Sequence, residues 1–507
     1  MSVPGVSLSI AGGVREFGSA VPETVAVIDG DRRLTYGELH ERSSRLANAL
    51  AAAGLAPGDP VAVLLGNRLE YHEIAAGIAK AGLVMVPLNP RLLPADSAFI
   101  MGHSRARAII YDESLADRVE PLPGGLRTHL TIGAGGSYEQ ALAEADTEDP
   151  QVPADERDPF CIAYTSGTTG EPKGVLISHR SRVLTFYMSA LDWRLGPGRT
   201  SIAVAPMYHG AGFAFGYAPV FTGGTVVMLP RWAPEGLLAL IERHRAQSVF
   251  LVPTHAQAVR ALGDEALRSH DLSSLDTLFF NAAALPVPLK DWVIESFPGV
   301  DVHEVYGSTE AGVITDLRPP DARRKAGSVG HPWFMTEVRL LDDDGAEVPP
   351  GTPGELFSRS PFLMNGYLRD PAATEACLSP DGFLTSGDVA VRDEEGYITI
   401  VDRKKDLIIT GGVNVYPRDV ETVLEGCPGV AECAVVGEPD EMWGERIVAY
   451  AVAAPGHDLG PEAITEFLGG RLARHKVPKD VRLLPSLPRN AAGKVLKREL
   501  RTVLVEE

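Results

Sequence analysis

Short apolar runs that alternate with helical stretches are the feature of the first third of the chain that most restricts its fold. Runs of this length, bounded by turn residues, indicate buried strands. Thr35 and Glu38 form a capping-box pattern that predicts a helix start, and Gly54 is placed to end that helix in a left-handed conformation. Repeated strand–helix–strand units predict parallel sheets covered by helices. The four apolar runs are VAVID (25–29), PVAVLLG (60–66), VMVPL (84–88) and AIIYD (108–112).

The pattern changes twice farther along the chain. A polar, proline-bearing stretch near Pro150 predicts an exposed connection, after which the alternation resumes. From about Gly327 to Ile400 short strands and turns predominate, which predicts a β-rich subdomain. With 507 residues, the chain exceeds one ordinary core. We therefore expect an α/β multidomain protein, with a large N-terminal domain (1–402) of two α/β subdomains plus the β-rich subdomain, and a small mobile α+β domain (403–507).

The composition is that of a globular protein, with 45% hydrophobic and 22% charged residues. A formal net charge of -20 argues against a general nucleic-acid binder, since neutralising phosphates needs a broad basic surface. Anionic ligands must therefore meet local basic groups. The four cysteines include no CxxC pair, and the first residues lack the basic and apolar regions of a signal peptide, so a cytoplasmic location is expected.

One segment is long enough to test for a membrane span, because residues 200–230 include no Lys, Arg, Asp or Glu. Pro206, Pro219 and several glycines would break the helix that lipid requires of exposed backbone. The segment is therefore expected to form a buried strand, loop and helix, and no transmembrane segment is expected.

The strongest chemical signal is YTSGTTGEPKGV at 164–175, which follows a strand-like run. Glycines let backbone amides approach phosphate oxygens, hydroxyl groups add donors, and Lys173 supplies positive charge. The order of glycine and lysine does not fit the GxxxxGK[ST] pattern, so a P-loop kinase or GTPase is disfavoured. The segment instead resembles the phosphate-binding loop of the acyl-adenylate-forming superfamily, which includes acyl-CoA synthetases, adenylation domains and luciferases.

Further motifs support this resemblance, because they occur in the family's order and continue to the C-terminal region. The resemblance implies an acid–thiol ligase that uses ATP, Mg²⁺ and coenzyme A. One departure lies in the adenine-binding segment, where NAAALP replaces the commoner Gly-Gly-Ala-Pro-Leu type. The further motifs are APMYHG (205–210), NAAALP (281–286), YGSTE (306–310), TSGD (385–388), VDRKKDLIITGG (401–412) and PRNAAGK (488–494).

The resemblance assigns the triphosphate and adenine sites to separate stretches of the chain. Hydroxyl and amide groups of the glycine-rich loop would hold the β- and γ-phosphates. A tyrosine would stack on the adenine ring, since every base offers a π-face to an aromatic side chain. The adenine would lie against Tyr306 and along the backbone of Asn281, Ala282 and Ala283. The phosphate-binding residues would be Thr165, Ser166, Gly167, Thr168, Thr169 and Lys173.

The YGSTE and TSGD motifs would supply the remaining contacts to the nucleotide. Beside Gly307, Thr309 resembles the residue that hydrogen-bonds the α-phosphate. Glu310 resembles the Mg²⁺ ligand, a hard carboxylate oxygen suited to that ion. Asp388 resembles the carboxylate that accepts hydrogen bonds from both ribose hydroxyls, with Arg403 contributing.

The C-terminal motifs would serve the two half-reactions. Lys405 falls at the family's hinge position, where backbone rotation reorients the small domain. Lys494 resembles the lysine that bridges the substrate carboxylate and the α-phosphate and neutralises charge in the transition state. Its basic neighbours between 471 and 498 would be available to coenzyme A phosphates. The thiol-acceptor site would include Gly411, Gly412 and Trp443.

The sequence says least about the residues that form the acyl-binding pocket. His209 resembles the histidine beside that pocket, although a histidine of the core would fit nearly as well. Phe213, Phe215 and Tyr217 indicate either an apolar acyl cavity or plain packing. Fatty and aryl acids therefore both remain open. Catalytic roles are expected for Thr165, His209, Glu310 and Lys494.

The predicted reaction is attack of a carboxylate on the α-phosphorus of ATP, which yields acyl-AMP and pyrophosphate, followed by transfer of the acyl group to coenzyme A. A free-standing ligase that loads an acyl carrier protein would share the first step. An inert regulator that binds acyl-adenylates or nucleotides would keep the fold without the reaction. Release of pyrophosphate on adding acid and ATP separates the enzyme from such a binder.

Overall fold

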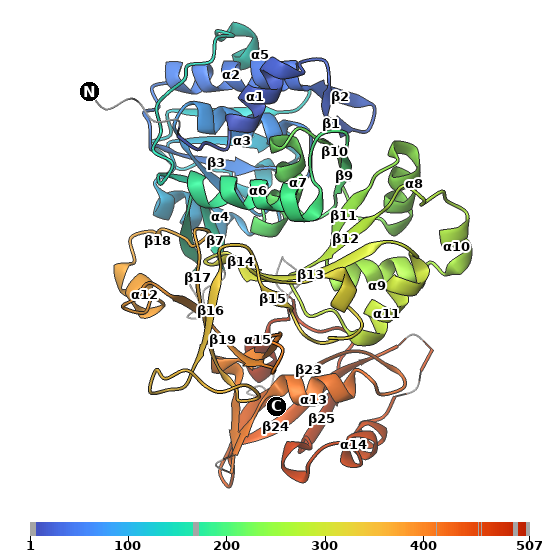
Figure 1. The fold of residues 1–507 in the computed structure, drawn as a ribbon. Helices are drawn as coiled ribbons and strands as arrows, with labels where there is room; N and C mark the ends of the chain where they lie inside the picture. The colour runs from blue at the N-terminus through green and yellow to red at the C-terminus, as the bar shows by residue number, and fades with distance from the viewer. Residues whose placement is uncertain are drawn as a thin grey trace. The chain divides into compact units, whose positions relative to one another are not determined.

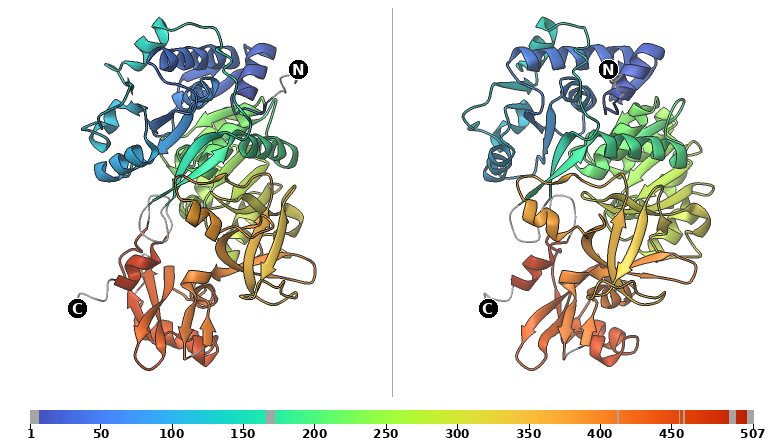
Figure 2. Two further views of the ribbon diagram at one scale, coloured as in Figure 1. Left: turned by 90° about the vertical axis from the view of Figure 1, so that its left-hand side faces the viewer. Right: turned by 60° about the vertical axis from the view of Figure 1, so that its left-hand side comes forward.

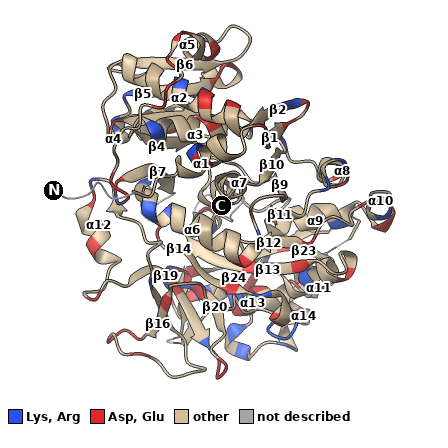
Figure 3. Cartoon of the chain, turned by 45° about the horizontal axis from the view of Figure 1, so that its top comes forward, with Lys and Arg blue, Asp and Glu red and all other residues tan. Residues whose placement is uncertain are grey.

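The computed structural model describes residues 7–165, 172–411, 413–454, 456–457, 459–489 and 495–502. The chain divides into two compact units (Figure 1). The first unit comprises Met1–Glu337 and Ser358–Leu384, and the second comprises Val338–Phe357 and Thr385–Glu507. Acidic and basic residues occur on elements throughout the chain (Figure 3).

The first unit contains a seven-stranded sheet in the order β18-β8-β7-β4-β3-β5-β6. The strands from β7 to β6 run parallel, and β8 and β18 are antiparallel additions at one edge. Their bounds are β3 Pro60–Leu64, β4 Val84–Leu88, β5 Ala108–Asp112, β6 Thr128–Ile132, β7 Pro159–Thr165, β8 Lys173–Ser178 and β18 Gly366–Tyr367.

A nine-stranded sheet in the order β15-β14-β13-β12-β11-β9-β10-β1-β2 completes the sheets of the first unit. The strands from β1 to β13 run parallel, and β2, β14 and β15 are antiparallel. Their bounds are β1 Val25–Asp29, β2 Arg32–Thr35, β9 Thr200–Ala203, β10 Thr225–Met228, β11 Ser248–Leu251, β12 Thr277–Phe280, β13 Asp301–Ser308, β14 Gly312–Leu317 and β15 His331–Pro332.

Both sheets of the first unit are buried on two faces, because alternate side chains of each strand enter different cores. In β3, Val61 and Val63 join the core between the sheets, whereas Ala62 and Leu64 join a core beneath α4. Figures 1 and 2 show the helices covering both faces. Between the sheets lie α1 Gly12–Ala20, α2 Tyr36–Ala52, α3 Glu70–Lys80, α6 His179–Trp193 and α7 Gly210–Phe221, and on the outer faces α4 Pro94–Ser104, α8 Pro234–His244, α9 Pro253–Ala261 and α11 Val287–Ser296.

The second unit is built on two smaller sheets, one of them four-stranded in the order β16-β17-β19-β20 and the other in the order β22-β21-β24-β23 with β25 beside β24. Helices α13 Pro417–Leu424 and α14 Pro461–Gly469 pack on the second of these. The strand bounds are β16 Glu337–Leu341, β17 Gly354–Arg359, β19 Leu384–Arg392, β20 Ile398–Arg403, β21 Ile408–Thr410, β22 Val413–Val415, β23 Val430–Asp440, β24 Gly444–Ala453 and β25 Asp480–Leu483.

The predicted α/β multidomain fold is confirmed, together with the strands read from the first third of the chain. The capping box of α2 is present, with Thr35 Oγ1 accepting from the Glu38 amide and Glu38 accepting from the Thr35 amide. Gly54 follows the helix at a φ of +85°. The uncharged segment 200–230 forms β9, α7 and β10 as expected. Within the described ranges, no helix has the length and apolarity needed to cross a bilayer.

The internal contacts divide the chain differently from the boundary at residue 402 that the sequence predicts, and that boundary stays a prediction. The second unit includes Val338–Phe357 and residues 385–402 of the β-rich region together with the C-terminal residues. The hinge near Lys405 also stays a prediction.

A buried lysine joins the helices of the first unit to the connection near residue 150. The Nζ atom of Lys80, a fully buried side chain, donates to the His40 carbonyl oxygen at 2.7 Å and to Ser44 Oγ at 2.9 Å. Asp149 Oδ2 lies 3.5 Å from Lys80 Nζ and 2.8 Å from Arg15 Nε. Burial lowers the pKa of Lys80 to about 7, because the core disfavours the ammonium form.

We expect the free energy of unfolding to increase with pH above about 7, because the unfolded chain, whose lysine titrates near 10.4, then binds more protons than the native state. The contribution of one such lysine is at most about 1.4 kcal/mol per pH unit. Urea unfolding of the wild type and of Lys80→Met at several pH values between 7 and 9.5 measures it. Equal pH slopes in the two proteins would contradict the expectation.

Candidate active site

The predicted adenine-binding residues leave the nine-stranded sheet at one edge. Phe280 at the end of β12 pairs with Glu304, so Asn281 leaves the sheet beside the last residues of β13, which stay paired with β14. The loop that carries His209 follows the parallel strand β9. The carboxyl ends of parallel strands are where open α/β sheets bind ligands.

The segment after β12 has a strained backbone. Ala282 has a φ of +74°, a left-handed conformation that a methyl side chain disfavours. The side chain of Asn281 accepts a hydrogen bond from the Ala282 amide, and the side chains of Ala282 and Ala283 are exposed. Strain that is not compensated by buried packing is typical of a ligand-binding loop.

Tyr306, Gly307, Thr309 and Glu310 lie at a tight hairpin formed by β13 and β14. Gly307 must be glycine, because a Cβ atom there would lie 2.0 Å from the carbonyl oxygen of Gly312 in the opposite strand. All four predicted residues are partly exposed. The close approach of the two strands fixes the turn that presents Thr309 and Glu310.

The predicted phosphate loop is a hairpin connection between β7 and β8. Thr165 and Lys173 are paired at its base, so the two ends of the loop are held together. Both side chains are partly exposed. Ser166, Gly167, Thr168 and Thr169 lie outside the described residues.

A third segment, residues 364–367, connects this hairpin to Glu310. β18 pairs with β8, and the hydroxyl of Tyr367 donates to Glu310 Oε1 at 3.0 Å. The Met364 amide donates to the carbonyl oxygen of Glu310 at 2.7 Å. Lys173 Nζ lies 4.9 Å from the centre of the Tyr367 ring. The base of the phosphate loop and the predicted metal ligand are therefore brought together by packing within the first unit.

Glu310 has the properties of a Mg²⁺ ligand. Its Oε2 atom accepts no hydrogen bond from the described residues, and its side chain is partly exposed. No cluster of three or more His, Cys, Asp or Glu side chains suitable for a metal ion occurs in the described part of the chain. A single carboxylate fits Mg²⁺ that retains water and takes its other ligands from substrate phosphates. Mg²⁺ held there would neutralise phosphate charge.

The aromatic residues of α7 lie on two faces of the helix. Phe213 and Tyr217, four positions apart, stack at 4.9 Å within the core between the sheets. Phe215 is only partly buried, and it packs against the same core by stacking on Phe250 of β11 at 4.4 Å and on Trp193 at 5.3 Å. For Phe213 and Tyr217 the packing interpretation is therefore correct, and Phe215 remains a candidate for the acyl pocket.

His209 precedes α7 and is exposed, so it is not a histidine of the core. Surrounding protein atoms nevertheless lower the pKa of His209 by desolvation, which favours the neutral imidazole. A neutral, accessible ring at this strand edge can accept or donate a hydrogen bond without adding charge.

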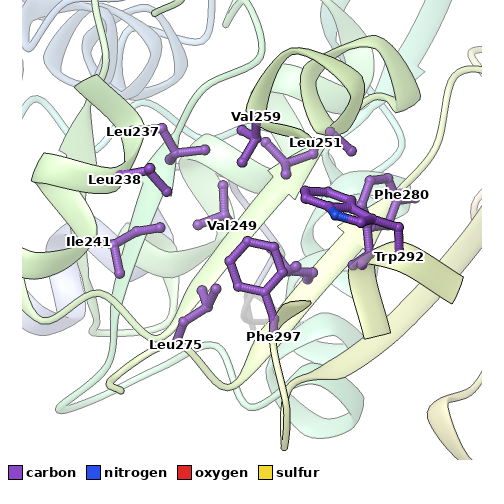
Figure 4. A pocket seen from close by; sticks show the side chains of 13 residues that line it. Leu237, Leu238, Ile241, Val249, Leu251, Val259, Leu275, Phe280, Trp292 and Phe297 are labelled. Atoms are coloured by element: carbon purple, nitrogen blue, oxygen red, sulfur yellow. The ribbon is translucent and has the colours of Figure 1, made fainter. Parts of the chain in front are cut away.

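A small cavity beneath the outer helices belongs to the core rather than to the site (Figure 4). Its volume is about 20 Å³, and apolar side chains such as Leu251, Phe280 and Trp292 line it. An apolar space of this size stays dry and cannot accommodate an acyl group.

In the second unit, the predicted ribose ligands form an ion pair across neighbouring strands. Asp388 of β19 pairs with Arg403 of β20, and Arg403 Nε lies 3.0 Å from Asp388 Oδ1. Ser386 Oγ donates to Asp388 Oδ2 at 2.9 Å. A carboxylate oxygen is the type of acceptor that ribose hydroxyls need.

The predicted hinge lysine follows this pair directly. Lys405 is exposed in the short 3₁₀ helix Lys404–Asp406. Partial desolvation lowers the pKa of Lys405. The neighbouring Lys404 is anchored by Asp343 at 2.8 Å and by Glu355 at 3.0 Å, so the two lysines differ in how firmly they are held.

Two of the predicted thiol-site residues contact each other. The Gly411 amide donates to the Trp443 carbonyl oxygen at 2.7 Å, and a Cβ atom at Gly411 would lie 2.9 Å from the indole ring. Trp443 is exposed, and Lys479 Nζ lies 5.6 Å from the centre of its ring. Gly412 and Lys494 lie outside the described residues.

The basic C-terminal stretch is less available to phosphates than its sequence indicates. Four of its cations are paired with carboxylates from distant parts of the second unit. The pairs are Lys476–Asp419, Arg482–Glu438, Arg489–Glu432 and Lys497–Glu421. Lys479, beside Trp443, remains the cation best placed near the predicted thiol site.

The sequence alone does not single out Tyr367 or the position of Lys479. Tyr367 lies between the recognised motifs, and nothing in its local sequence indicates that β18 pairs with β8. Lys479 was one of several similar cations, and only the fold distinguishes it by its position over Trp443.

Two family models match the chain. One, described as AMP-binding enzyme, matches residues 14–368. The other, described as AMP-binding enzyme C-terminal domain, matches residues 419–494. Together they include the phosphate loop, the adenine segment and the lysine-bearing C-terminal motif.

Relatives and solved structures match the chain from end to end. It is 39% identical to feruloyl-CoA synthase of Amycolatopsis sp over 483 residues, covering 95% of this chain and 96% of the relative. It is 36% identical over 494 residues to the fatty acid–[acyl-carrier-protein] ligase ScoC of Streptomyces coeruleorubidus, covering 95% of this chain and 93% of the relative. ATP-bound MatB from Rhodopseudomonas palustris has a TM-score of 0.91 at 30% identity, covering 98% of this chain and 99% of that chain.

We expect Gly307→Ala to open the β13–β14 hairpin, because the added methyl would meet the Gly312 carbonyl oxygen at 2.0 Å. Overpacking of this kind costs roughly 1–3 kcal/mol of stability and would displace Tyr306 and Glu310. Gly102→Ala in α4 is the matched control, since nothing lies within 4 Å of its added methyl. Urea unfolding and ATP-binding calorimetry measure both effects, and unchanged ATP binding in Gly307→Ala would contradict the assignment.

Proposed function

The chain belongs to the AMP-binding enzyme family, and from this we propose that it is an AMP-forming ligase that joins a carboxylic acid to coenzyme A. The observation that carries the proposal is the likeness to feruloyl-CoA synthase along nearly the whole chain. The family and the enzyme class expected from the motifs are confirmed, as is the expected use of ATP, Mg²⁺ and coenzyme A.

In the first half-reaction a carboxylate oxygen attacks the α-phosphorus of ATP, and pyrophosphate leaves. The adenine lies against Tyr306 and the Asn281–Ala283 backbone, and Thr309 donates to the α-phosphate. Thr165 and Lys173, at the base of the phosphate loop, contact the β- and γ-phosphates. No protein nucleophile is needed, because positioning and electrostatic stabilisation suffice for this transfer.

Residues of the C-terminal motifs complete the nucleotide site. Asp388 accepts hydrogen bonds from the ribose hydroxyls and is held in place by Arg403, 3.0 Å away. Lys494 bridges the substrate carboxylate and the α-phosphate, so it acts only while the acyl-adenylate forms. These roles rest on the motif positions and, for Asp388 and Arg403, on their cross-strand pairing.

In the second half-reaction the thiol of coenzyme A attacks the acyl carbon and AMP leaves. We propose that rotation about Lys405 withdraws Lys494 and presents the Gly411–Gly412 segment to the thiol. The contact of Gly411 with Trp443 supports a thiol site there. Lys479, over the same indole, supplies a cation for a coenzyme A phosphate.

The acid is proposed to be an aryl or fatty acid, with His209 and Phe215 beside it. Support comes from the feruloyl-CoA and fatty acid ligases among the relatives. The stacking of Phe215 on Phe250 supplies an aromatic wall near the strand edge.

A cytoplasmic location is proposed because Cys161, Cys377, Cys427 and Cys433 are all free thiols, as is usual in a reducing compartment.

The proposal is tested by measuring pyrophosphate release and thioester formation with aryl, fatty and dicarboxylic acids. Coenzyme A and an acyl carrier protein compete as acceptors in the same assays. Thioester formation with coenzyme A is the expected result and identifies the acid. Transfer to the carrier protein alone would place the chain with ScoC-like ligases, whereas binding of ATP without pyrophosphate release from any acid would indicate an inert binder.

Lys494→Ala separates the two half-reactions. We expect it to slow acyl-adenylate formation by about 100- to 1,000-fold, the loss typical for removing one transition-state charge contact. Thioester formation from supplied acyl-AMP should be retained, because Lys494 does not act in that step. Single-turnover assays of each half-reaction measure both rates, and an equal loss in both would show that the role is assigned wrongly.

A further inference from the structure

Tyr367 lies between two groups of opposite charge that the reaction needs. Its hydroxyl donates to Glu310 Oε1 at 3.0 Å, and Lys173 Nζ lies 4.9 Å from the centre of its ring. The three residues come from distant parts of the chain and meet because β18 pairs with β8 beside the β13–β14 turn. One phenol therefore contacts both the predicted metal ligand and the phosphate-loop lysine.

The segment around Tyr367 holds Glu310 at two points. Its side chain accepts from Tyr367, and its carbonyl oxygen accepts from the Met364 amide at 2.7 Å. The segment is itself fixed on β8, since the Leu368 amide donates to the Gly174 carbonyl oxygen at 2.7 Å. The carboxylate of Glu310 therefore has a defined orientation relative to the base of the phosphate loop.

The hydrogen bond leaves the rest of the carboxylate available. Burial and the neighbouring Glu310 carboxylate raise the pKa of Tyr367, so its hydroxyl keeps its proton and acts as the donor. Oε2 of Glu310 accepts nothing from the described residues. A hydrogen bond to one oxygen of a ligating carboxylate is how an outer residue orients a metal ligand.

Lys173 and Glu310 contact different parts of Tyr367, the ring and the hydroxyl. No ion pair within 4 Å joins them, although both lie against the same phenol. Opposite charges within 4 Å of each other attract and would favour a direct pair. Such a pair would occupy the cation needed for phosphates and the carboxylate needed for Mg²⁺. A π-face in contact with the ammonium leaves the lysine's donors free for phosphate oxygens.

We propose that Tyr367 is a positioning residue for the adenylation step. Its hydroxyl orients Glu310 for Mg²⁺, and its ring prevents Lys173 from pairing with Glu310. This inference rests on the proposed function, because it assigns Glu310 to Mg²⁺ and Lys173 to the triphosphate.

The two contributions are separated by two substitutions. Tyr367→Phe removes the hydroxyl and keeps the ring, whereas Tyr367→Leu removes both. The matched control is Tyr111→Phe, which removes a similar hydrogen bond, from Tyr111 to Glu120 Oε1 at 3.1 Å, on β5 of the same unit. Thermal unfolding of each variant establishes that it is folded.

Calorimetry of ATP binding, without any acid, is the readout. Each protein is titrated once with saturating Mg²⁺ and once with EDTA, so that the gain in affinity due to Mg²⁺ is obtained separately from the affinity for ATP alone. For Tyr367→Phe we expect the gain to fall by roughly 10- to 100-fold, as for other residues that orient metal ligands, with the affinity in EDTA unchanged. For Tyr367→Leu we expect the affinity in EDTA to fall as well.

Each outcome decides one claim. The orienting role is overturned if Mg²⁺ increases the ATP affinity of Tyr367→Phe as much as that of the wild type. It is also overturned if Tyr111→Phe loses as much of this increase as Tyr367→Phe does. If Tyr367→Leu binds ATP in EDTA as tightly as the wild type does, the ring does not prevent Lys173 from pairing with Glu310. If the wild type forms thioester yet Tyr367→Phe behaves as wild type, only this inference fails, whereas a wild type that neither binds ATP nor releases pyrophosphate overturns the proposed function itself.

Discussion

Repulsion between two anions is the constraint on which the arrangement of this protein depends. A carboxylate must approach a triphosphate, and like charges 4 Å apart repel by about 4 kcal/mol at an effective dielectric constant of 20. The chain carries a net charge of -20, so its overall field opposes the encounter. The cations of the site must therefore be local and unpaired, which is the condition that Tyr367 maintains for Lys173.

Much of the site could be predicted because its residues follow strands of parallel sheets. The apolar runs gave β1, β3, β4 and β5 at the expected ranges, and the motifs at Thr165, Asn281 and Tyr306 lie at or beyond the ends of β7, β12 and β13. Local sequence is sufficient where the required geometry is a turn after a strand, such as the Gly307 hairpin.

The parts that could not be predicted depend on contacts between distant residues. Tyr367 reaches Glu310 only because β18 joins a sheet whose other strands precede it by many residues. The basic C-terminal stretch looked unpaired, yet Lys476 and Lys497 meet Asp419 and Glu421 in the folded unit. Likewise, the sequence of α7 does not tell which of its aromatic side chains are fully buried and which stay partly exposed.

Because acyl-adenylate formation and thioester formation are proposed to share one site, some residues must act in only one of the two reactions. The Asp388–Arg403 pair ties β19 to β20 immediately before the 3₁₀ helix that contains Lys405. A proposed ribose contact next to the exposed Lys405 suits a proposed rotation that keeps the nucleotide and exchanges Lys494 for the Gly411 segment. The contact of Gly411 with Trp443 gives that segment a defined shape.

Transfer of oxygen from the acid to AMP tests the central claim most directly. With a substrate acid that carries ¹⁸O in its carboxylate, attack on the α-phosphorus places one labelled oxygen in the phosphate of the released AMP, which mass spectrometry detects. The account predicts labelled AMP in an amount equal to the thioester formed. Unlabelled AMP, or release of ADP with phosphate, would contradict an acyl-adenylate route.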